Sequence, residues 1–251
     1  PHEPWDPPRH YVDRYDPGYR GREVITPRYG PSDYLTDAEL NHMRALYAGE
    51  VTMVDHWLGK FVEWAKALGM LDDTVLIVTA DHGHQLGEHG LTGKVSAGLY
   101  SELTDVPLLI RHPRGERAGQ VCDAFAQNHD LAPTILGLLE ITPPVPMEGI
   151  DLWQQLEGKF ARRPYITASM DDYIWCRDDT YRYFAHNDGA NPHLFDVERD
   201  PQQRVDLAAD LPNVCRLMFE RVREDAGGPM PDYPQYKNLK EMEWWELYRF
   251  R

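Results

Sequence analysis

The sequence has no long hydrophobic run, few cysteines and too few basic residues to balance its acidic ones. Its longest apolar runs, such as Val75 to Val78, are far below the roughly 18 residues that a membrane-spanning helix needs, so we expect no membrane partner. The three cysteines form no CxxC pair, which argues against a disulfide framework and a thiolate zinc site. Lys and Arg total 26 against 41 Asp and Glu, a net charge of −15, which disfavours nucleic acid as a partner.

Enough apolar and aromatic residues are present to form a folded core. Hydrophobic residues make up 42% of the 251 positions and include seven Trp and fourteen Tyr. Residues 1–35 have no helical or strand periodicity, so we expect an irregular segment anchored by aromatics. Thr36 to Glu39 form a capping box, and apolar residues then recur in steps of three and four from Leu40 to Leu68. This pattern predicts one long amphipathic helix that Gly69 closes.

The next part of the chain alternates strand and helix patterns, and the last part has the pattern of short strands separated by turns. The β-branched apolar run 74–80 predicts a central strand covered on both faces, and a second strand at 106–111 and a helix from Asp130 follow. The fold class is therefore α/β. From about Gly158 the pattern of short aromatic strands predicts a small antiparallel sheet with one covering helix. An extended tail is expected to pack back from Gly227. The four strands are expected at 165–169, 173–176, 181–186 and 193–197, and the helix at 212–225.

Residues with metal-binding and acid-base chemistry gather directly after the first of these strands. The fourteen residues from Asp81 to Lys94 contain three His, two acidic residues, one Lys and four Gly. Gly83 permits a turn that frees the side chains of Asp81 and His82 to bind the same divalent ion. An ordinary turn followed by a solvated loop carrying His84 and His89 is the alternative. The concentration of ligand types beside a buried strand favours a functional site.

The segment TVLIVTADHGHQLGEHGLTGK, residues 74–94, resembles the second signature region of the sulfatase family within the alkaline-phosphatase superfamily. Residues 1–5, 48–58 and 193–208 resemble further landmarks of the same family. The resemblance implies a sulfatase-like mixed sheet flanked by helices, with a small C-terminal antiparallel sheet and helix. On this basis, residues 1–157 would be the C-terminal part of the catalytic α/β domain, and residues 158–251 a small subdomain with an extended tail.

The same resemblance implies roles for four residues. Asp81 and His82 fall on metal-ligand positions, and Lys94 falls on the lysine that contacts the sulfate or phosphonate oxygens and the leaving-group oxygen. His2 falls on the histidine at the leaving-group side, so both His2 and Lys94 are expected to bind substrate and to act in catalysis. Calcium is the usual metal of the family, whereas an imidazole ligand also suits manganese or magnesium.

The chain departs from the family at the nucleophile. The family motif C/S-x-P/A-x-R, whose first residue becomes formylglycine, does not occur in the sequence, and the paired aspartates that complete the metal site are absent as well. The chain therefore resembles the C-terminal portion of such an enzyme, and formylglycine is expected in a missing N-terminal part. That N-terminal part would be the partner of this chain, and we expect the isolated chain to be inactive without it.

Three functions are compatible with these residues. The first is metal-dependent hydrolysis of a sulfate ester, and the second is hydrolysis of a phosphonate or phosphate ester on the same scaffold. The third is a catalytically silent metal-binding module, which the lack of a nucleophile supports. No targeting signal can be read at Pro1, so the periplasm, the extracellular space and the cytoplasm all stay open as compartments.

Overall fold

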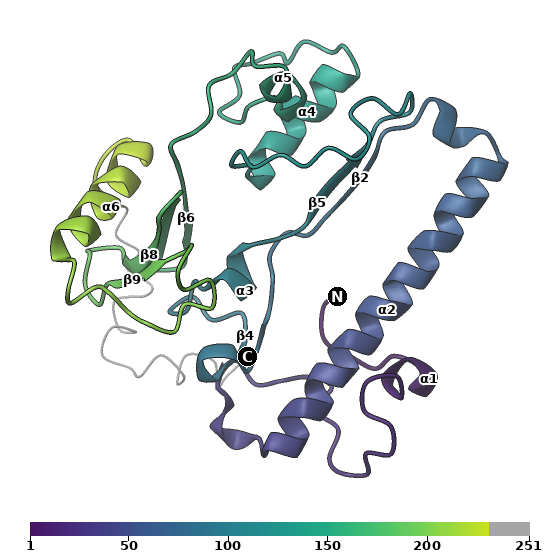
Figure 1. Ribbon diagram of the computed structural model, residues 1–251, viewed down its shortest axis with the longest axis vertical. Coiled ribbons are helices and arrows are strands. Elements are labelled where there is room, and N and C mark those ends of the chain that lie inside the picture. Colours follow the sequence, from purple (N-terminus) through teal and green to yellow (C-terminus); the bar gives the residue numbers. More distant parts are fainter. Residues whose placement is uncertain (231–251) are drawn as a thin grey trace. The chain divides into compact units, whose positions relative to one another are not determined.

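The computed structural model describes residues 1–230, and its ribbon is drawn in Figure 1. The chain divides into two compact units, one made of Pro1–Ala118 and one that begins at Gly119. The domain boundary expected after residue 157 stays a prediction. Most of the tail that was expected to pack back from Gly227 lies outside the described residues. Within the described part, no helix is both long and apolar enough to span a bilayer.

The longest element of the first unit is the helix α2, Asp37–Ala67, as the periodicity predicted. Its capping box is complete, because the Glu39 amide donates to the Thr36 hydroxyl over 3.3 Å and the Thr36 amide donates to the Glu39 carboxylate over 2.8 Å. Gly69 adopts a left-handed φ of 71° one residue after the C-cap Leu68, and this conformation ends the helix. The short 3₁₀ helix η2, Met70–Asp72, follows.

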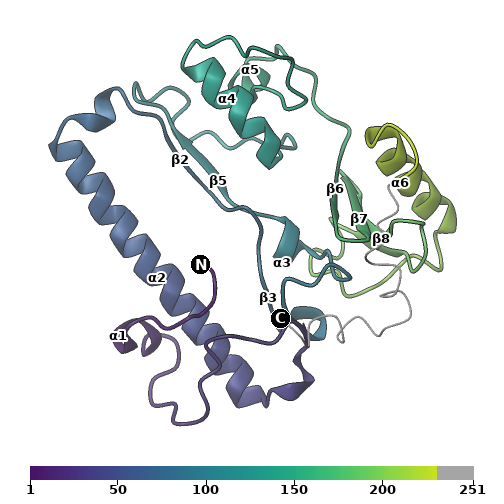
Figure 2. The ribbon, with the colours of Figure 1, turned by 180° about the vertical axis from the view of Figure 1, so that it is seen from behind.

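The segment before α2 packs against this helix. The short helix α1, Arg9–Val12, lies beside α2 in both views (Figures 1 and 2), and the 3₁₀ helix η1, Ser32–Tyr34, precedes α2. Trp5 is fully buried, and its backbone amide donates to the carbonyl oxygen of Ile25 over 2.7 Å. It belongs to a core that also contains Val12, Val24, Met43, Ala45 and Leu46. The aromatic anchoring expected for this segment is therefore present, and it fixes the backbone next to His2 and Glu3.

The strand that leads to the site is less covered than its apolar sequence predicted. Strand β2, Leu76–Thr79, pairs antiparallel with β5, Leu108–Arg111, and the two form a two-stranded sheet. The side chains of β2 are only partly buried, and Leu109 on β5 is 60% exposed. The predicted central strand covered on both faces is not observed among the described residues, because β2 has one neighbouring strand there and none of its side chains is fully buried.

A second small sheet, which the sequence patterns did not predict, carries the residues after the site turn. Its strands are β1, Gly30–Pro31, β3, Gln85–Leu86, and β4, Leu91–Gly93, in the antiparallel order β1-β4-β3. The 3₁₀ helix η3, Glu88–Gly90, joins β3 to β4. The short helix α3, Ser101–Thr104, follows. This sheet connects the segment before α2 to the residue that precedes Lys94.

The second unit contains the antiparallel sheet expected from the sequence. Its strands have the order β6-β7-β8-β9 and are Tyr165–Met170, Tyr173–Asp178, Tyr181–His186 and His193–Asp196. Helix α6, Pro212–Asp225, packs on one face and contributes Cys215, Met218 and Val222 to a core with Ile174 and Tyr183. The same unit holds the 3₁₀ helix η4, Asn128–Asp130, and the helices α4, Leu131–Leu138, and α5, Leu152–Leu156. The predicted helix from Asp130 is thereby confirmed.

Candidate functional site

The turn after β2 is held against helix α3 by backbone hydrogen bonds. The amide of Gly83 donates to the carbonyl oxygen of Leu103 over 2.8 Å, and the amide of His84 donates to that of Glu102 over 2.9 Å. A Cβ atom on Gly83 would overlap the Glu102 carbonyl oxygen. The close backbone approach therefore requires glycine at this position, and it fixes the direction in which Asp81 and His82 leave the strand.

Asp81 and His82 form a pair of metal-ligand types on the surface of the first unit. Asp81 Oδ2 lies 3.5 Å from His82 Nε2, and the two side chains are 87% and 40% exposed. His82 Nδ1 lies 2.7 Å from the carbonyl oxygen of Gly83, so it carries the proton and leaves Nε2 as the basic nitrogen. Although partial desolvation raises it, the hydrogen bond from the His82 amide and the charge of Lys94 lower the pKa of Asp81. The carboxylate is thus ionised, as a metal ligand must be.

The pair fits part of a metal shell. A carboxylate oxygen and an imidazole nitrogen that converge within 3.5 Å can bind one divalent cation together. Among residues 1–230, however, no three His, Cys, Asp or Glu side chains gather closely enough to hold a metal ion. Any further ligands of an ion at this pair would come from outside the described residues or from water.

Lys94 and His2, which lie 92 positions apart in the sequence, meet in the structure. Lys94 Nζ lies 2.9 Å from His2 Nε2, and His2 Nδ1 lies 2.6 Å from the carbonyl oxygen of Glu3. Lys94 follows β4, and the fully buried Gln85 side chain holds the next residues, because it accepts from the Val95 amide and donates to the Gly98 carbonyl oxygen over 3.3 and 2.6 Å. The sequence expectation that these two residues act in one place is compatible with this geometry.

Glu3 and Tyr29 lie close to the Lys94 ammonium group, and His84 lies on the other side of Glu3; none of the three was predicted as a site residue. Glu3 is 8% exposed, and its Oε1 atom accepts a hydrogen bond from the Tyr29 hydroxyl and lies 3.9 Å from Lys94 Nζ. Glu3 Oε2 lies 3.9 Å from His84 Nδ1. The only sequence signal for Glu3 is its place next to His2, because its burial depends on contacts with residues far along the chain.

His84 is a buried neutral imidazole rather than a solvated loop residue. Its ring packs edge-on against Trp5 with the centroids 4.8 Å apart, and it also contacts Tyr29 and Tyr47. Burial, together with the charges of Lys94, His82 and His2, lowers the pKa of His84 to about 4. His89 is also held in place, because it stacks on Tyr100 with the centroids 3.6 Å apart. The solvated-loop alternative is therefore wrong for both histidines.

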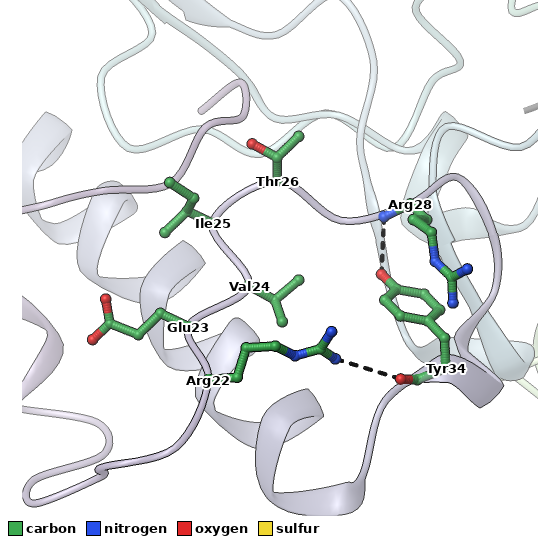
Figure 3. Close-up of a pocket in the computed structure, with 7 residues that line it drawn as sticks. All are labelled: Arg22, Glu23, Val24, Ile25, Thr26, Arg28 and Tyr34. Atoms are coloured by element: carbon green, nitrogen blue, oxygen red, sulfur yellow. Dashed lines mark hydrogen bonds between the residues drawn. The ribbon is translucent and has the colours of Figure 1, made fainter. Parts of the chain in front are cut away.

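A separate hollow of about 530 Å³ is lined by residues of the segment before α2 (Figure 3). The Arg28 guanidinium lies 3.9 Å from the centroid of the Tyr34 ring, and the Arg28 amide donates to the Tyr34 hydroxyl over 2.9 Å. The carbonyl oxygen of Arg28 accepts from Thr92 on β4 over 2.7 Å. The seven lining residues include none of the four predicted site residues and are Arg22, Glu23, Val24, Ile25, Thr26, Arg28 and Tyr34.

Comparison with known proteins shows the family of the chain. Residues 1–141 match the family model for sulfatases, and residues 87–224 match the model for the C-terminal region of N-sulphoglucosamine sulphohydrolase. Each match covers more than half of the chain. The chain therefore belongs to the sulfatase family, within the alkaline-phosphatase superfamily.

Several relatives have the same architecture or a related sequence. The multifunctional alkaline phosphatase superfamily protein PehA of Trinickia caryophylli is 33% identical over 80% of this chain and 42% of its own length. An arylsulfatase of Clostridium perfringens is 27% identical over 82% of this chain and 47% of its own length. The crystal structure of the phosphonate monoester hydrolase of Agrobacterium radiobacter superposes with a TM-score of 0.66 at 26% identity, over 79% of this chain and 47% of that one. The chain thus spans less than half the length of these relatives.

Proposed function

We propose that this chain belongs to a sulfate ester hydrolase, to which it contributes the residues that act on the leaving group and part of the metal site. The observation that carries the proposal is the meeting of Lys94 Nζ and His2 Nε2 at 2.9 Å in a chain of the sulfatase family. Cleavage of a sulfate ester builds negative charge on the departing oxygen, so a fixed ammonium group and a proton donor at that oxygen lower the barrier. Lys94 and His2 supply these two groups.

Each site residue has a separate task in this proposal. Lys94 neutralises the sulfuryl oxygens and the leaving-group oxygen, and His2, when it is protonated at Nε2, donates a hydrogen bond or proton to that oxygen. Asp81 Oδ2 and His82 Nε2 would hold a divalent ion, with calcium as the family's usual metal and manganese or magnesium as alternatives. When bound, such an ion stabilises negative charge on the nonbridging oxygens. The nucleophile, a formylglycine, would come from an N-terminal portion of the same protein.

Hydrolysis of a phosphonate or phosphate ester is the second candidate. The relative with 33% identity is named a multifunctional superfamily protein, and a phosphonate monoester hydrolase shares the fold at 26% identity. These similarities support a phosphorus ester as the alternative substrate. Lys94 and His2 would act on the leaving oxygen of either ester in the same way.

The test combines an intact-mass measurement on the purified native protein with hydrolysis assays. We expect a mass above 29.1 kDa and turnover of an aryl sulfate that a chelator abolishes. Lys94→Ala should lower kcat by about 100-fold or more, because a fixed charge at the leaving group is lost. Lys60→Ala is the matched control, since Lys60 lies on α2 and pairs with Glu63.

Each result separates the candidate functions. Faster turnover of a phenyl phosphonate ester than of the aryl sulfate would favour the second candidate. A mass near 29.1 kDa with no turnover of either ester would reject the enzyme for this chain and leave the metal-binding module.

A further inference from the structure

Glu3 is a buried carboxylate that lies directly behind the Lys94–His2 pair. Its side chain is 8% exposed, whereas that of His2 is 69% exposed. Burying a carboxylate is costly unless opposite charges or hydrogen bonds compensate for the lost water. Although burial opposes ionisation, the Tyr29 hydrogen bond and the charge of Lys94 provide this compensation, and they hold the pKa of Glu3 below its usual value. Glu3 is therefore a fixed negative charge inside the site.

The Glu3 carboxylate lies near Lys94 but forms no hydrogen-bonded ion pair with it. The distance of 3.9 Å from Glu3 Oε1 to Lys94 Nζ exceeds hydrogen-bond length. Within the described residues, Glu3 Oε2 accepts no hydrogen bond, although it faces His2 Nδ1 at 3.7 Å and His84 Nδ1 at 3.9 Å. The Glu3 carboxylate thus attracts the Lys94 ammonium group at close range, while the ammonium protons stay available to another acceptor. In the structure that acceptor is His2 Nε2.

Tyr29 holds the Glu3 carboxylate in place, and this carboxylate in turn orients Lys94. The Tyr29 hydroxyl donates to Glu3 Oε1, and the Tyr29 ring lies 5.5 Å from Lys94 Nζ. A side chain on Gly93 would overlap this ring, so the glycine before Lys94 allows the close approach of Tyr29. Together these contacts leave the Lys94 side chain, which is 14% exposed, little room for another direction.

We infer that Glu3 is a positioning residue, which holds the Lys94 ammonium group directed toward the leaving-group side of the substrate. The inference rests on the proposed function for its chemistry, because it assigns Lys94 to the departing oxygen. It adds a residue that touches no substrate and acts through the Lys94–His2 pair. A carboxylate at this position weakens the attraction for an anionic ester, so its benefit should be seen in turnover and not in binding.

The kinetic test is the substitution Glu3→Gln, which keeps an acceptor for Tyr29 and removes the charge. We expect kcat for a sulfate ester to fall by about 10- to 100-fold, the range that a displaced catalytic group typically costs, while KM stays within about threefold. The loss should be larger for an alkyl sulfate than for 4-nitrophenyl sulfate, because a poor leaving group depends more on Lys94. Glu3→Asp should recover part of the loss. Equal losses for both esters, or a rise in KM alone, would overturn the inference.

A second measurement needs no turnover and therefore separates this inference from the proposed function. Nitrogen-15 spectra of the histidine rings in the 251-residue chain report the tautomer of His2. The structure gives His2 a proton on Nδ1, facing the Glu3 carbonyl oxygen, and an accepting Nε2 that faces Lys94. We expect this single tautomer in the unmodified chain and an average of both tautomers in Glu3→Gln and in Lys94→Met. An unchanged His2 spectrum in a folded Glu3→Gln chain would refute the positioning role.

Glu50→Gln is the matched control for both measurements. Glu50 Oε1 accepts from the Asp6 amide over 3.1 Å and so ties the same N-terminal segment to α2 without touching Lys94. If Glu50→Gln reproduces the effects of Glu3→Gln, the carboxylate serves only to hold the segment and the inference fails. If Glu3→Gln does not fold, Tyr29→Phe takes its place and should shift the His2 spectrum in the same direction by a smaller amount. Absence of hydrolysis in the unmodified protein would reject the proposed function, while the His2 spectra would still decide this inference.

Discussion

At the scale of single residues, the site depends on backbone contacts that only one residue type permits. Gly83 lies between the two predicted metal ligands and His84, and its Cα faces the carbonyl oxygen of Glu102. The backbone hydrogen bonds to Leu103 and Glu102 hold it there. A larger residue must push the turn away from α3, and the direction of Asp81 and His82 would change with it.

We therefore expect Gly83→Ala to lower the free energy of unfolding by about 1–3 kcal/mol, because the new methyl group overlaps a fixed carbonyl oxygen. Urea unfolding followed by circular dichroism measures this change. Gly59→Ala is the control, since Gly59 lies within α2 with no atom near its Cα face, and it should raise stability by about 0.5–1 kcal/mol. Equal stability of the Gly83→Ala and unmodified chains would contradict the proposed tight turn.

At the scale of elements, a buried ion pair connects the start of α4 to the strand region of the second unit. The fully buried Asp130 carboxylate accepts from both terminal nitrogens of Arg163 over 2.6 and 2.7 Å. The amides of Ile150 and Gln127 donate to it over 2.9 and 2.8 Å. Although burial opposes ionisation, these hydrogen bonds lower the pKa of Asp130. The second unit should therefore lose stability in acid when this carboxyl is protonated.

The sign of this pH dependence follows from the lowered pKa. A carboxyl with a depressed pKa contributes stability above its unfolded pKa, near 4, and this contribution is lost as the pH falls through the lower folded value. Asp130→Asn should cost about 3 kcal/mol at pH 7, because it leaves Arg163 without its buried partner. The difference from the unmodified chain should shrink below about pH 4. Hydrogen exchange of the second unit between pH 3 and 7 measures both effects.

Asp179→Asn provides the comparison for this prediction. Asp179 pairs with Arg162 over 2.7 Å, but both side chains are at least half exposed. An exposed pair contributes less than about 1 kcal/mol, so this variant should differ little from the unmodified chain at any pH. A loss of stability as large as that of Asp130→Asn would mean that removal of any one negative charge, and not burial of the pair, determines the effect.

The elements that the sequence predicted well are those whose signals are local. The capping box and the apolar residues spaced three or four apart predict the start of α2 to within one residue. The short aromatic segments separated by turns predict the β6-β7-β8-β9 sheet. The β1-β4-β3 sheet was not predicted, because its strands have two or three residues and no periodicity can be read from them. Glu3 was missed for a related reason, since its burial depends on Tyr29, His84 and Lys94, which lie 26 or more positions away.

At the scale of the whole molecule, α2 carries an apolar stripe that the described residues leave exposed. Six large side chains, spaced three or four residues apart, are 43–75% exposed, and these are Val51, Val54, Trp57, Phe61, Trp64 and Leu68. Exposed apolar surface of this extent on one helix face promotes association. The net charge of −15 opposes it through repulsion between copies.

We expect the 251-residue chain to self-associate at micromolar concentration, and more strongly as salt screens the repulsion between copies. The double substitution Phe61→Glu and Trp64→Glu should shift the chain toward monomer in sedimentation velocity, because it breaks the centre of the stripe. Lys66→Glu changes the net charge by the same two units near the end of α2 but leaves the six apolar side chains in place, so it should alter association far less. If the unmodified chain stays monomeric in high salt, where repulsion is screened, the apolar stripe does not drive association. If Lys66→Glu disperses the chain as well as the double substitution does, net charge and not the stripe controls its solution behaviour.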